Sequence, residues 1–192
     1  MRRLSNVLIP LPKKIEEGDK TFKLAGFAGS VAVRLGAKCD LTKSAREVIE
    51  KKLLSLADVK CDGKRGDYTI RINVRPEDAA FFDTESDEAY YIKTGKRETE
   101  LCGKSASGAF YAAVTFAEML EAVYDDVLVK EAYIFDYPDM KYRGHTIESR
   151  YGTEFMTKEE YFDIIDYFAA PKINRLCPTL YDCWNYQYDT RW

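Results

Sequence analysis

Few residues of this 192-residue chain combine the type and spacing that chemistry at a site requires. His145 is the single histidine, and no two of the cysteines form a CxxC pair; these are Cys39, Cys61, Cys102, Cys177 and Cys183. A zinc site needs closely spaced cysteine and histidine ligands, so we expect no metal and no cofactor. The odd number of cysteines indicates reduced thiols, which we expect to be buried as small apolar side chains. We expect His145 to be structural rather than a general base.

The C-terminal part of the chain suggests a different chemistry, that of binding a sugar. Residues 181–192 read YDCWNYQYDTRW, where aromatic rings alternate with amide and carboxylate side chains. Aromatic faces stack on the C–H bonds of sugars, and the polar groups would suit sugar hydroxyls. A loop that packs on a larger domain would show the same pattern. Tyr181, Asp182 and Trp184 are therefore candidate sugar-binding residues, with packing as the alternative.

The charge pattern excludes several classes of partner. Lys and Arg number 29 against 32 Asp and Glu, which leaves a net charge of -3 with neither sign gathered into a block. Neither nucleic acid nor an anionic membrane surface is therefore an expected partner. No apolar run approaches the ~18 residues that cross a bilayer, and residues 1–10 lack the apolar stretch of ~7 residues found in secretory leaders. We expect a globular, cytoplasmic protein.

Apolar periodicity predicts an α+β (α/β) domain over residues 1–137. Alternation of apolar and polar residues predicts strands, and apolar residues at helical spacing predict two helices. The expected elements are strands within 18–36, a helix from Thr42 with Thr42 or Ser44 as its cap, a strand at 67–74, a hairpin of 88–94 with 99–102, a helix at 109–124 and an extended segment at 127–135. This order predicts a small mixed sheet with helices on one face.

A turn-forming stretch at 136–139 separates this domain from a second part, 138–192. The expected elements there are a strand within 140–148, a helix at 157–170 that opens with a capping box of Thr157 and Glu160, and a strand within 173–180. Together they make a βαβ unit, which begins a parallel sheet but cannot bury both of its faces alone. We therefore expect an incomplete domain whose exposed apolar side chains favour self-association.

Short motifs in the second part carry a family resemblance: DYPDMKYRG at 136–144, IE and YG within 147–152, and KIN at 172–174. They resemble the entry to the catalytic (β/α)8 barrel of the N-acetylhexosaminidases of glycoside hydrolase families 20 and 84. Residues 88–115 are similar to the non-catalytic α/β accessory domain that precedes this barrel. The resemblance covers most of the chain. It implies that 138–192 is the first βαβ unit of a truncated (β/α)8 barrel.

The resemblance implies substrate-assisted hydrolysis of N-acetylhexosamine glycosides, in which the substrate's own 2-acetamido oxygen attacks the anomeric carbon. In these families the acidic pair lies on the fourth barrel strand, beyond Trp192, so this chain alone is expected to be inactive. Arg143 matches the family-20 arginine that hydrogen-bonds sugar hydroxyls, with an ion pair at the domain junction as the alternative. Glu148 could accept from a sugar hydroxyl, hold Arg143 in place or pair with Arg150.

The match to each family is incomplete. Tyr181 stands where family 84 has a sugar-binding lysine, and the histidine-rich second strand of family 20 has no counterpart in residues 175–179. Two other interpretations therefore stay open. One is a fragment of an α-glucuronidase-like enzyme, whose leading domain is similar, and the other is a stand-alone carbohydrate-binding or interaction module.

Overall fold

The computed structural model describes residues 2–62, 66–75, 82–147 and 156–178. The chain divides into two compact units, Met1–Asp139 and Met140–Trp192. Within the described ranges each unit has its own sheet, of eight strands in the first unit and two in the second. No helix in these ranges is long and apolar enough to cross a membrane.

The sheet of the first unit mixes parallel and antiparallel strands. In chain order its strands are β1 (Lys14–Gly26), β2 (Ser30–Leu35), β3 (Lys60–Asp62), β4 (Thr69–Val74), β5 (Tyr90–Thr94), β6 (Glu98–Gly103), β7 (Glu121–Val123) and β8 (Asp126–Asp136). In space they follow the order β1-β8-β5-β6-β4-β2-β3, and β7 pairs with β8. β5 pairs antiparallel with β6 and β8, while β4 pairs parallel with β2 and β6. The mixed sheet is as predicted, although it is larger than the small sheet expected.

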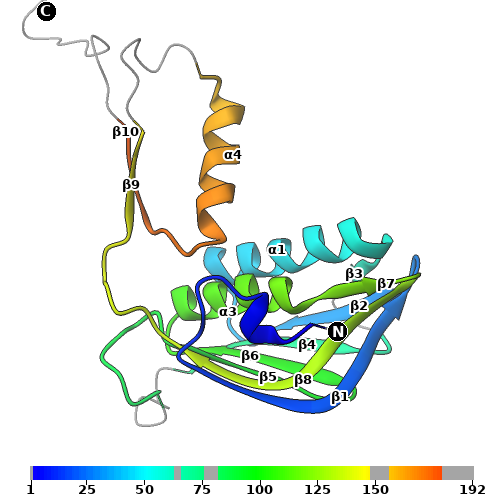
Figure 1. The fold of residues 1–192 in the computed structure, drawn as a ribbon. Coiled ribbons are helices and arrows are strands. Elements are labelled where there is room, and N and C mark those ends of the chain that lie inside the picture. Colours follow the sequence, from blue (N-terminus) through cyan, green and yellow to red (C-terminus); the bar gives the residue numbers. More distant parts are fainter. Residues whose placement is uncertain (1, 63–65, 76–81, 148–155, 179–192) are drawn as a thin grey trace, which may run out of the picture. The chain divides into compact units, whose positions relative to one another are not determined.

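Two helices, α1 (Asp40–Ala57) and α3 (Ala106–Met119), lie next to each other on one face of this sheet (Figure 1). The core between the helices and the sheet is apolar. Its members include Ala45, Ile49 and Leu53 of α1, Ala109, Ala112 and Phe116 of α3, and Ile70, Ile72, Ile92 and Ile134 of the strands. The helical spacing of the apolar residues thus predicts the buried side of α1 correctly.

The start of α1 differs from the prediction. Cys39 is the N-cap, and Thr42 lies in the first turn of the helix. The Thr42 hydroxyl accepts from the Cys39 N–H (3.0 Å) and donates to the Ala37 carbonyl (2.8 Å). Thr42 and Ser44 are therefore wrong as caps, because the Thr42 side chain turns back to the preceding loop and fastens it to the helix.

The end of α3 also differs from the prediction. The helix begins after Ser105, whose side chain accepts from the amides of Ser107 and Gly108, and it ends at Met119 rather than at Tyr124. Leu120 is already extended, and the chain pairs with β8 as β7 before turning back at Tyr124, where φ is 53°. Strand pairing with a distant segment therefore overrides the helical spacing of the last residues.

Strand β8 shows how side chains are sorted between the two faces of the sheet. Ala132 and Ile134 belong to the core on the side of the helices. Tyr133 and Phe135, which alternate with them along the strand, belong to a second cluster. Its other members are Phe82, Ala89, Tyr91, Cys102 and Tyr137. Because successive side chains of a strand point to opposite faces, this second cluster lies on the face that α1 and α3 do not cover.

A buried polar network joins β5, α3 and β8. The Tyr90 hydroxyl is 2.7 Å from the Thr115 hydroxyl and donates to the Asp136 carboxylate at 2.8 Å. Burial and the Asp136 carboxylate raise the pKa of Tyr90 well above its usual value, so the phenol remains neutral and can donate. The Lys13 N–H also donates to Asp136, at 3.3 Å. The network therefore holds the N-terminal segment and the end of β8 to the core.

The second unit contains β9 (Gly144–Ile147), α4 (Lys158–Ala169) and β10 (Arg175–Pro178). β9 and β10 pair in parallel, and α4 lies between them in the sequence, so the predicted βαβ order is confirmed. Thr157 and Glu160 form the predicted capping box, with the Glu160 N–H donating to the Thr157 hydroxyl at 3.2 Å. No residue of α4 is buried, and Phe162 and Ile165 are 54% and 48% exposed. Residues on both sides of this helix thus remain in contact with solvent.

We predict that Tyr90→Phe lowers the free energy of unfolding by about 1–3 kcal/mol, because it leaves the buried Asp136 and Thr115 oxygens without their phenol partner. Urea denaturation followed by circular dichroism measures this change. Tyr133→Phe is the matched control, since Tyr133 is only half-buried, and it should change stability by less than about 0.5 kcal/mol. Equal effects of the two variants would contradict a stabilising role of the Tyr90 network.

Candidate functional site

Of the five candidate sugar-binding residues, Arg143 is the one that the structure describes. Glu148, Tyr181, Asp182 and Trp184 lie outside the described residues, and their role in sugar binding stays a prediction. Glu148 directly follows the last residue of β9, and the other three follow β10. In the sequence, all four residues thus come after the C-terminal end of a parallel strand.

Arg143 precedes β9 and is held by several hydrogen bonds within the second unit. Its Nε donates to the Lys172 carbonyl at 2.7 Å, and its Nη1 donates to the Met140 carbonyl at 2.7 Å. Its main-chain N–H donates to the Asn174 Oδ1 at 2.9 Å. The Arg143 carbonyl in turn accepts from the N–H groups of Asn174 (2.9 Å) and Arg175 (3.1 Å). Arg143 thus connects the two segments that enter the parallel strands.

Asn174 is a residue whose structural role the sequence analysis did not identify. Besides its bonds with Arg143, its Nδ2 donates to the Lys141 carbonyl at 2.8 Å. Asn174 and Arg143 therefore fasten residues 140–143 to residues 172–175 immediately before β9 and β10 begin to pair. An asparagine next to the start of a strand indicates such side-chain to main-chain bonding, but its partner lies 31 residues away in the chain.

The histidine and the acidic side chains that could take part in catalysis do not come together as a catalytic group in the described ranges. His145 is exposed on β9, and its ring centroid lies 4.5 Å from that of Phe168 in α4. Asp163 and Asp166 of α4 are exposed, in agreement with the solvated helix face that their positions suggest. Within the same ranges no cluster of three or more His, Cys, Asp or Glu side chains could hold a metal ion.

The cysteines correct one prediction. Cys102 is buried and Cys61 is half-buried, but Cys39 and Cys177 are exposed. The expectation of buried thiols is therefore wrong for Cys39 and Cys177. None of these four cysteines forms a disulfide, and Cys183 lies outside the described residues. Cys39 is exposed because it caps α1 at the surface. The Cys102 side chain is buried in the cluster with Phe82 and Tyr91, on the face of the sheet opposite the helices.

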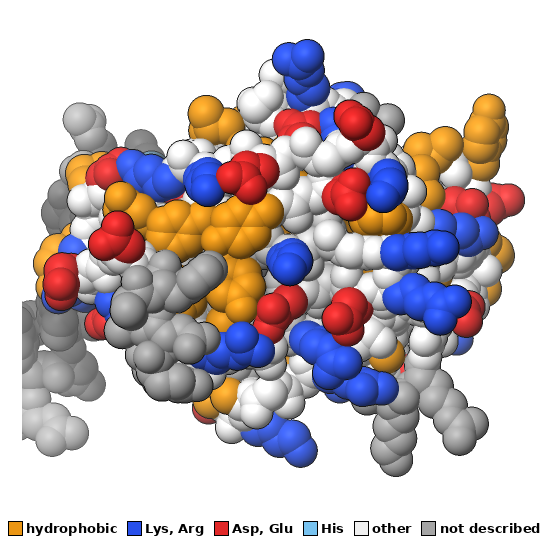
Figure 2. All heavy atoms as spheres, turned by 90° about the horizontal axis from the view of Figure 1, so that it is seen from below, with side chains coloured by type: hydrophobic (Ala, Val, Ile, Leu, Met, Phe, Trp, Pro, Cys, Tyr) orange, Lys and Arg blue, Asp and Glu red, His pale blue; other side chains and the backbone are white. Residues whose placement is uncertain are grey.

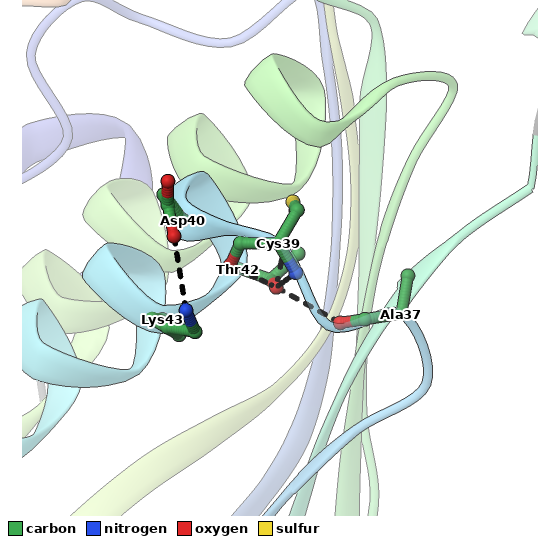
Figure 3. A network of polar contacts seen from close by, with 5 residues as sticks. All are labelled: Ala37, Cys39, Asp40, Thr42 and Lys43. Atoms are coloured by element: carbon green, nitrogen blue, oxygen red, sulfur yellow. Dashed lines mark hydrogen bonds and ion pairs between the residues drawn. The ribbon is translucent and has the colours of Figure 1, made fainter.

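Cys39 lies beside Thr42 at the start of α1, where the polar contacts also include Ala37 (Figure 3). Hydrogen bonds from the backbone and side chain of Thr42 lower its pKa, and the Cys39 Sγ lies 3.6 Å from the Thr42 Oγ1. Burial instead raises the pKa of Cys61 to about 11. The N-terminus of a helix favours a thiolate through its free N–H groups. No histidine lies near Cys39 in sequence, and these contacts alone do not define a nucleophilic site.

The architecture defines the class of this protein. A mixed sheet with two helices on one face is the arrangement that the resemblance predicts for the accessory domain, and a parallel strand–helix–strand unit follows it in the chain. Residues 6–137 match the family model described as glycosyl hydrolase family 20, domain 2. The match covers more than half of the chain, and the chain therefore belongs to glycosyl hydrolase family 20.

Similar proteins are known both by sequence and by structure. The Beta-hexosaminidase of Porphyromonas gingivalis (strain ATCC BAA-308 / W83) is 27% identical over an alignment of 181 residues, and the match covers 88% of this chain and 22% of that protein. The GH20 exo-β-N-acetylglucosaminidase of Vibrio harveyi has a TM-score of 0.70 at 22% identity, over 91% of this chain and 25% of that one. The GH20 β-N-acetylhexosaminidase of Streptomyces coelicolor A3(2) has a TM-score of 0.67 at 20% identity, over 92% and 35%.

We predict that Arg143→Lys loosens the junction before β9 and β10, because lysine lacks the planar fork that donates to two carbonyls at once. Amide hydrogen exchange at Asn174, whose N–H donates to the Arg143 carbonyl, should become roughly fivefold to tenfold faster. Arg175→Lys is the control, since the Arg175 guanidinium lies over the exposed ring of Tyr142, and it should leave the Asn174 exchange rate unchanged. An unchanged rate in Arg143→Lys would refute this role.

We predict that Cys39 reacts with iodoacetamide at lower pH than Cys61. The thiolate is the reactive form, so a lowered pKa moves the midpoint of the rate against pH below the ordinary value of about 8.5, and a raised pKa moves it above. Alkylation at a series of pH values, followed by peptide mass spectrometry, gives both midpoints from one sample. A midpoint for Cys39 equal to or above that of Cys61 would rule out the thiolate-stabilising contacts from Thr42.

Proposed function

We propose that this chain contributes domain 2 and the opening of the catalytic barrel to a glycoside hydrolase of the β-N-acetylhexosaminidase type. The observation that carries the proposal is the family-20 domain 2 match over residues 6–137. The similarity to the Porphyromonas gingivalis Beta-hexosaminidase supports the same activity class. The chain spans about a fifth of that relative, so the activity of the whole protein is an inference about more residues than these 192.

The proposed division is residues 1–137 for the accessory domain and 138–192 for the first βαβ unit of the barrel. Two observations support the second part. β9 and β10 pair in parallel with α4 between them in sequence, as consecutive strands of a (β/α)8 barrel do. The Vibrio harveyi and Streptomyces coelicolor structures cover more than nine-tenths of this chain, so the likeness in fold extends beyond Asp139.

The positions of the candidate residues agree with a sugar site in such a barrel. Active sites of these barrels lie at the C-terminal ends of the strands. Glu148 follows the end of β9, and Tyr181, Asp182 and Trp184 follow the end of β10. We propose that these four residues contact the substrate, a glycoside of an N-acetylhexosamine. A carboxylate accepts hydrogen bonds from sugar hydroxyls, and an aromatic ring stacks on the sugar face.

The main-chain contacts of Arg143 support a role in positioning the segments before β9 and β10, which is neither the sugar contact nor the ion pair expected from the sequence. Arg143 lies before β9, and two of its guanidinium nitrogens donate to main-chain carbonyls. A guanidinium has five N–H donors, so a further bond to a sugar hydroxyl is compatible with this geometry. We propose that Arg143 first positions the ends of the two strands and that any sugar contact comes in addition to this role.

The chemistry implied for this class is substrate-assisted hydrolysis with an acidic pair on the fourth barrel strand. The described part of the second unit holds two strands, β9 and β10. We propose that residues 1–192 contribute sugar contacts to the whole enzyme but do not themselves cleave the glycoside. The exposed apolar residues of α4, among them Phe162 and Ile165, support self-association of the isolated chain, because an uncovered βαβ unit leaves apolar surface in water.

Hydrolysis assays with two chromogenic substrates test this proposal. The protein encoded by the full reading frame should release nitrophenol from the nitrophenyl β-N-acetylglucosaminide and not from the nitrophenyl α-glucuronide. The 192-residue chain should release it from neither substrate. Cleavage of only the glucuronide by the full product would favour an α-glucuronidase-like enzyme. Turnover by the 192-residue chain alone, or no turnover by the full product, would overturn the proposal.

A further inference from the structure

The face of the eight-stranded sheet opposite the helices carries a continuous group of aromatic rings. We call the group of Phe82, Tyr91, Tyr133, Phe135 and Tyr137 the aromatic face. Figure 2 looks onto this side of the molecule and shows apolar side chains gathered together and bordered by acidic and basic ones. All five rings belong to the first unit, and none is assigned a role by membership of family 20.

The rings of the aromatic face touch one another across neighbouring strands. The centroids of Tyr91 and Tyr133 are 6.3 Å apart with near-parallel rings, and those of Phe135 and Tyr137 are 5.7 Å apart. Phe82 is fully buried between Tyr91 (6.1 Å) and Phe135 (6.5 Å) and forms the base of the group. Tyr133, Phe135 and Tyr137 are half-buried, so parts of their rings remain open to a ligand.

The open rings form a row along one direction. Tyr133, Phe135 and Tyr137 alternate at every second position of β8 and its continuation, and a strand rises roughly 3.3 Å per residue. The row is therefore about 13 Å long, which suits a short oligosaccharide better than a single sugar ring. The main chain of Tyr133 and of Phe135 is paired with β1 on one side and β5 on the other, which holds these two rings in place. Tyr137 directly follows the last residue of β8.

The charged groups beside the rings are already paired with opposite charges. Ion pairs join Lys13 to Asp139 (2.5 Å), Lys14 to Glu16 (2.8 Å) and Arg75 to Glu100 (2.8 Å). The ammonium groups of Lys13 and Lys14 also lie over the rings of Tyr137 (5.5 Å) and Tyr133 (5.7 Å). The positive and negative side chains of these ion pairs therefore balance one another at the edge of the aromatic face.

We propose that the aromatic face binds an uncharged oligosaccharide of N-acetylhexosamine units; the choice of this sugar rests on the function proposed above. A neutral chain needs no unpaired counter-charge, and its hydroxyls can bond to paired groups without separating them, because guanidinium and carboxylate keep further donors and acceptors. Aromatic rings stack on the apolar face of each sugar. An anionic polymer would need free cations, whereas the cations beside the rings are held in ion pairs. A protein interface has a similar aromatic centre and polar rim, so the oligomeric state is measured in the test below.

The proposed binding surface would give the enzyme a second contact with a polymeric substrate. A site on a rigid accessory domain adds affinity for long chains through effective concentration and leaves the affinity for a single sugar unchanged. It predicts that chain length, rather than the reacting sugar, determines the contribution of the aromatic face. Small chromogenic substrates would not reach it.

Calorimetry with the 192-residue chain and the N-acetylglucosamine hexamer tests this inference. We expect saturable binding that Tyr133→Ala and Tyr137→Ala each weaken roughly threefold to tenfold. Tyr124→Ala is the matched control, because Tyr124 is 98% exposed at the turn between β7 and β8 and lies outside the aromatic face, and it should leave the affinity unchanged. Tyr133→Leu, which keeps apolar volume but no ring, should bind as weakly as Tyr133→Ala, and circular dichroism establishes that each variant is folded.

Each other outcome overturns the inference. Binding that is equal in wild type and in the Tyr133 and Tyr137 variants would place the sugar elsewhere, and absence of heat with the hexamer would exclude the site. Light scattering that shows a dimer in wild type and a monomer in these variants would make the aromatic face a protein interface instead. None of these results affects hydrolysis of the chromogenic β-N-acetylglucosaminide by the full product, so this inference can fail while the proposed function stands.

Discussion

The first unit depends on one constraint: its sheet has two faces, and both helices cover the same one. Side chains alternate along a strand, so each residue that β5 or β8 directs toward α1 and α3 is followed by one on the other face. Ile92 and Ile134 meet the helices, and Tyr91, Tyr133 and Phe135 consequently lie on the opposite side. The aromatic face is therefore a consequence of building the core from the same strands.

Hydrogen bonds from side chains to distant partners fix the ends of the elements in both units. In the first unit the neutral phenol of Tyr90 joins Thr115 and Asp136 and so ties β5, α3 and β8 together. In the second unit Arg143 and Asn174 satisfy main-chain groups where β9 and β10 begin. The units differ in burial, since the first has a complete apolar core and α4 of the second has no buried residue.

Particular residues show how far prediction from the sequence reached. The alternation in 67–74 and 127–135 predicted β4 and β8, and the spacing of Thr157 and Glu160 predicted the start of α4. The motifs of 88–115 and 136–174 predicted a resemblance to the N-acetylhexosaminidases of families 20 and 84, and the match of residues 6–137 to domain 2 shows that the family is 20. The cap of α1 and the end of α3 were wrong, because Thr42 bonds to a loop and residues 121–123 pair with β8. Of the candidate sugar site, the structure describes Arg143, and the sequence did not predict its carbonyl contacts.

The sequence by itself determined which segments are helices and strands and which face of each is apolar, because these properties depend on residues a few positions apart. Its short motifs also indicated the hexosaminidase type of families 20 and 84, and the match of residues 6–137 to the domain 2 model decided for family 20. Only the tertiary structure decided the strand order, the partners of Tyr90 and Arg143, and the row of rings on the uncovered face. These features join residues that are far apart in the chain: Tyr90 and Asp136 are separated by 46 positions, and the pairing of β1 with β8 joins residues as distant as Lys14 and Phe135. Such contacts arise only when the sheet brings the strands together.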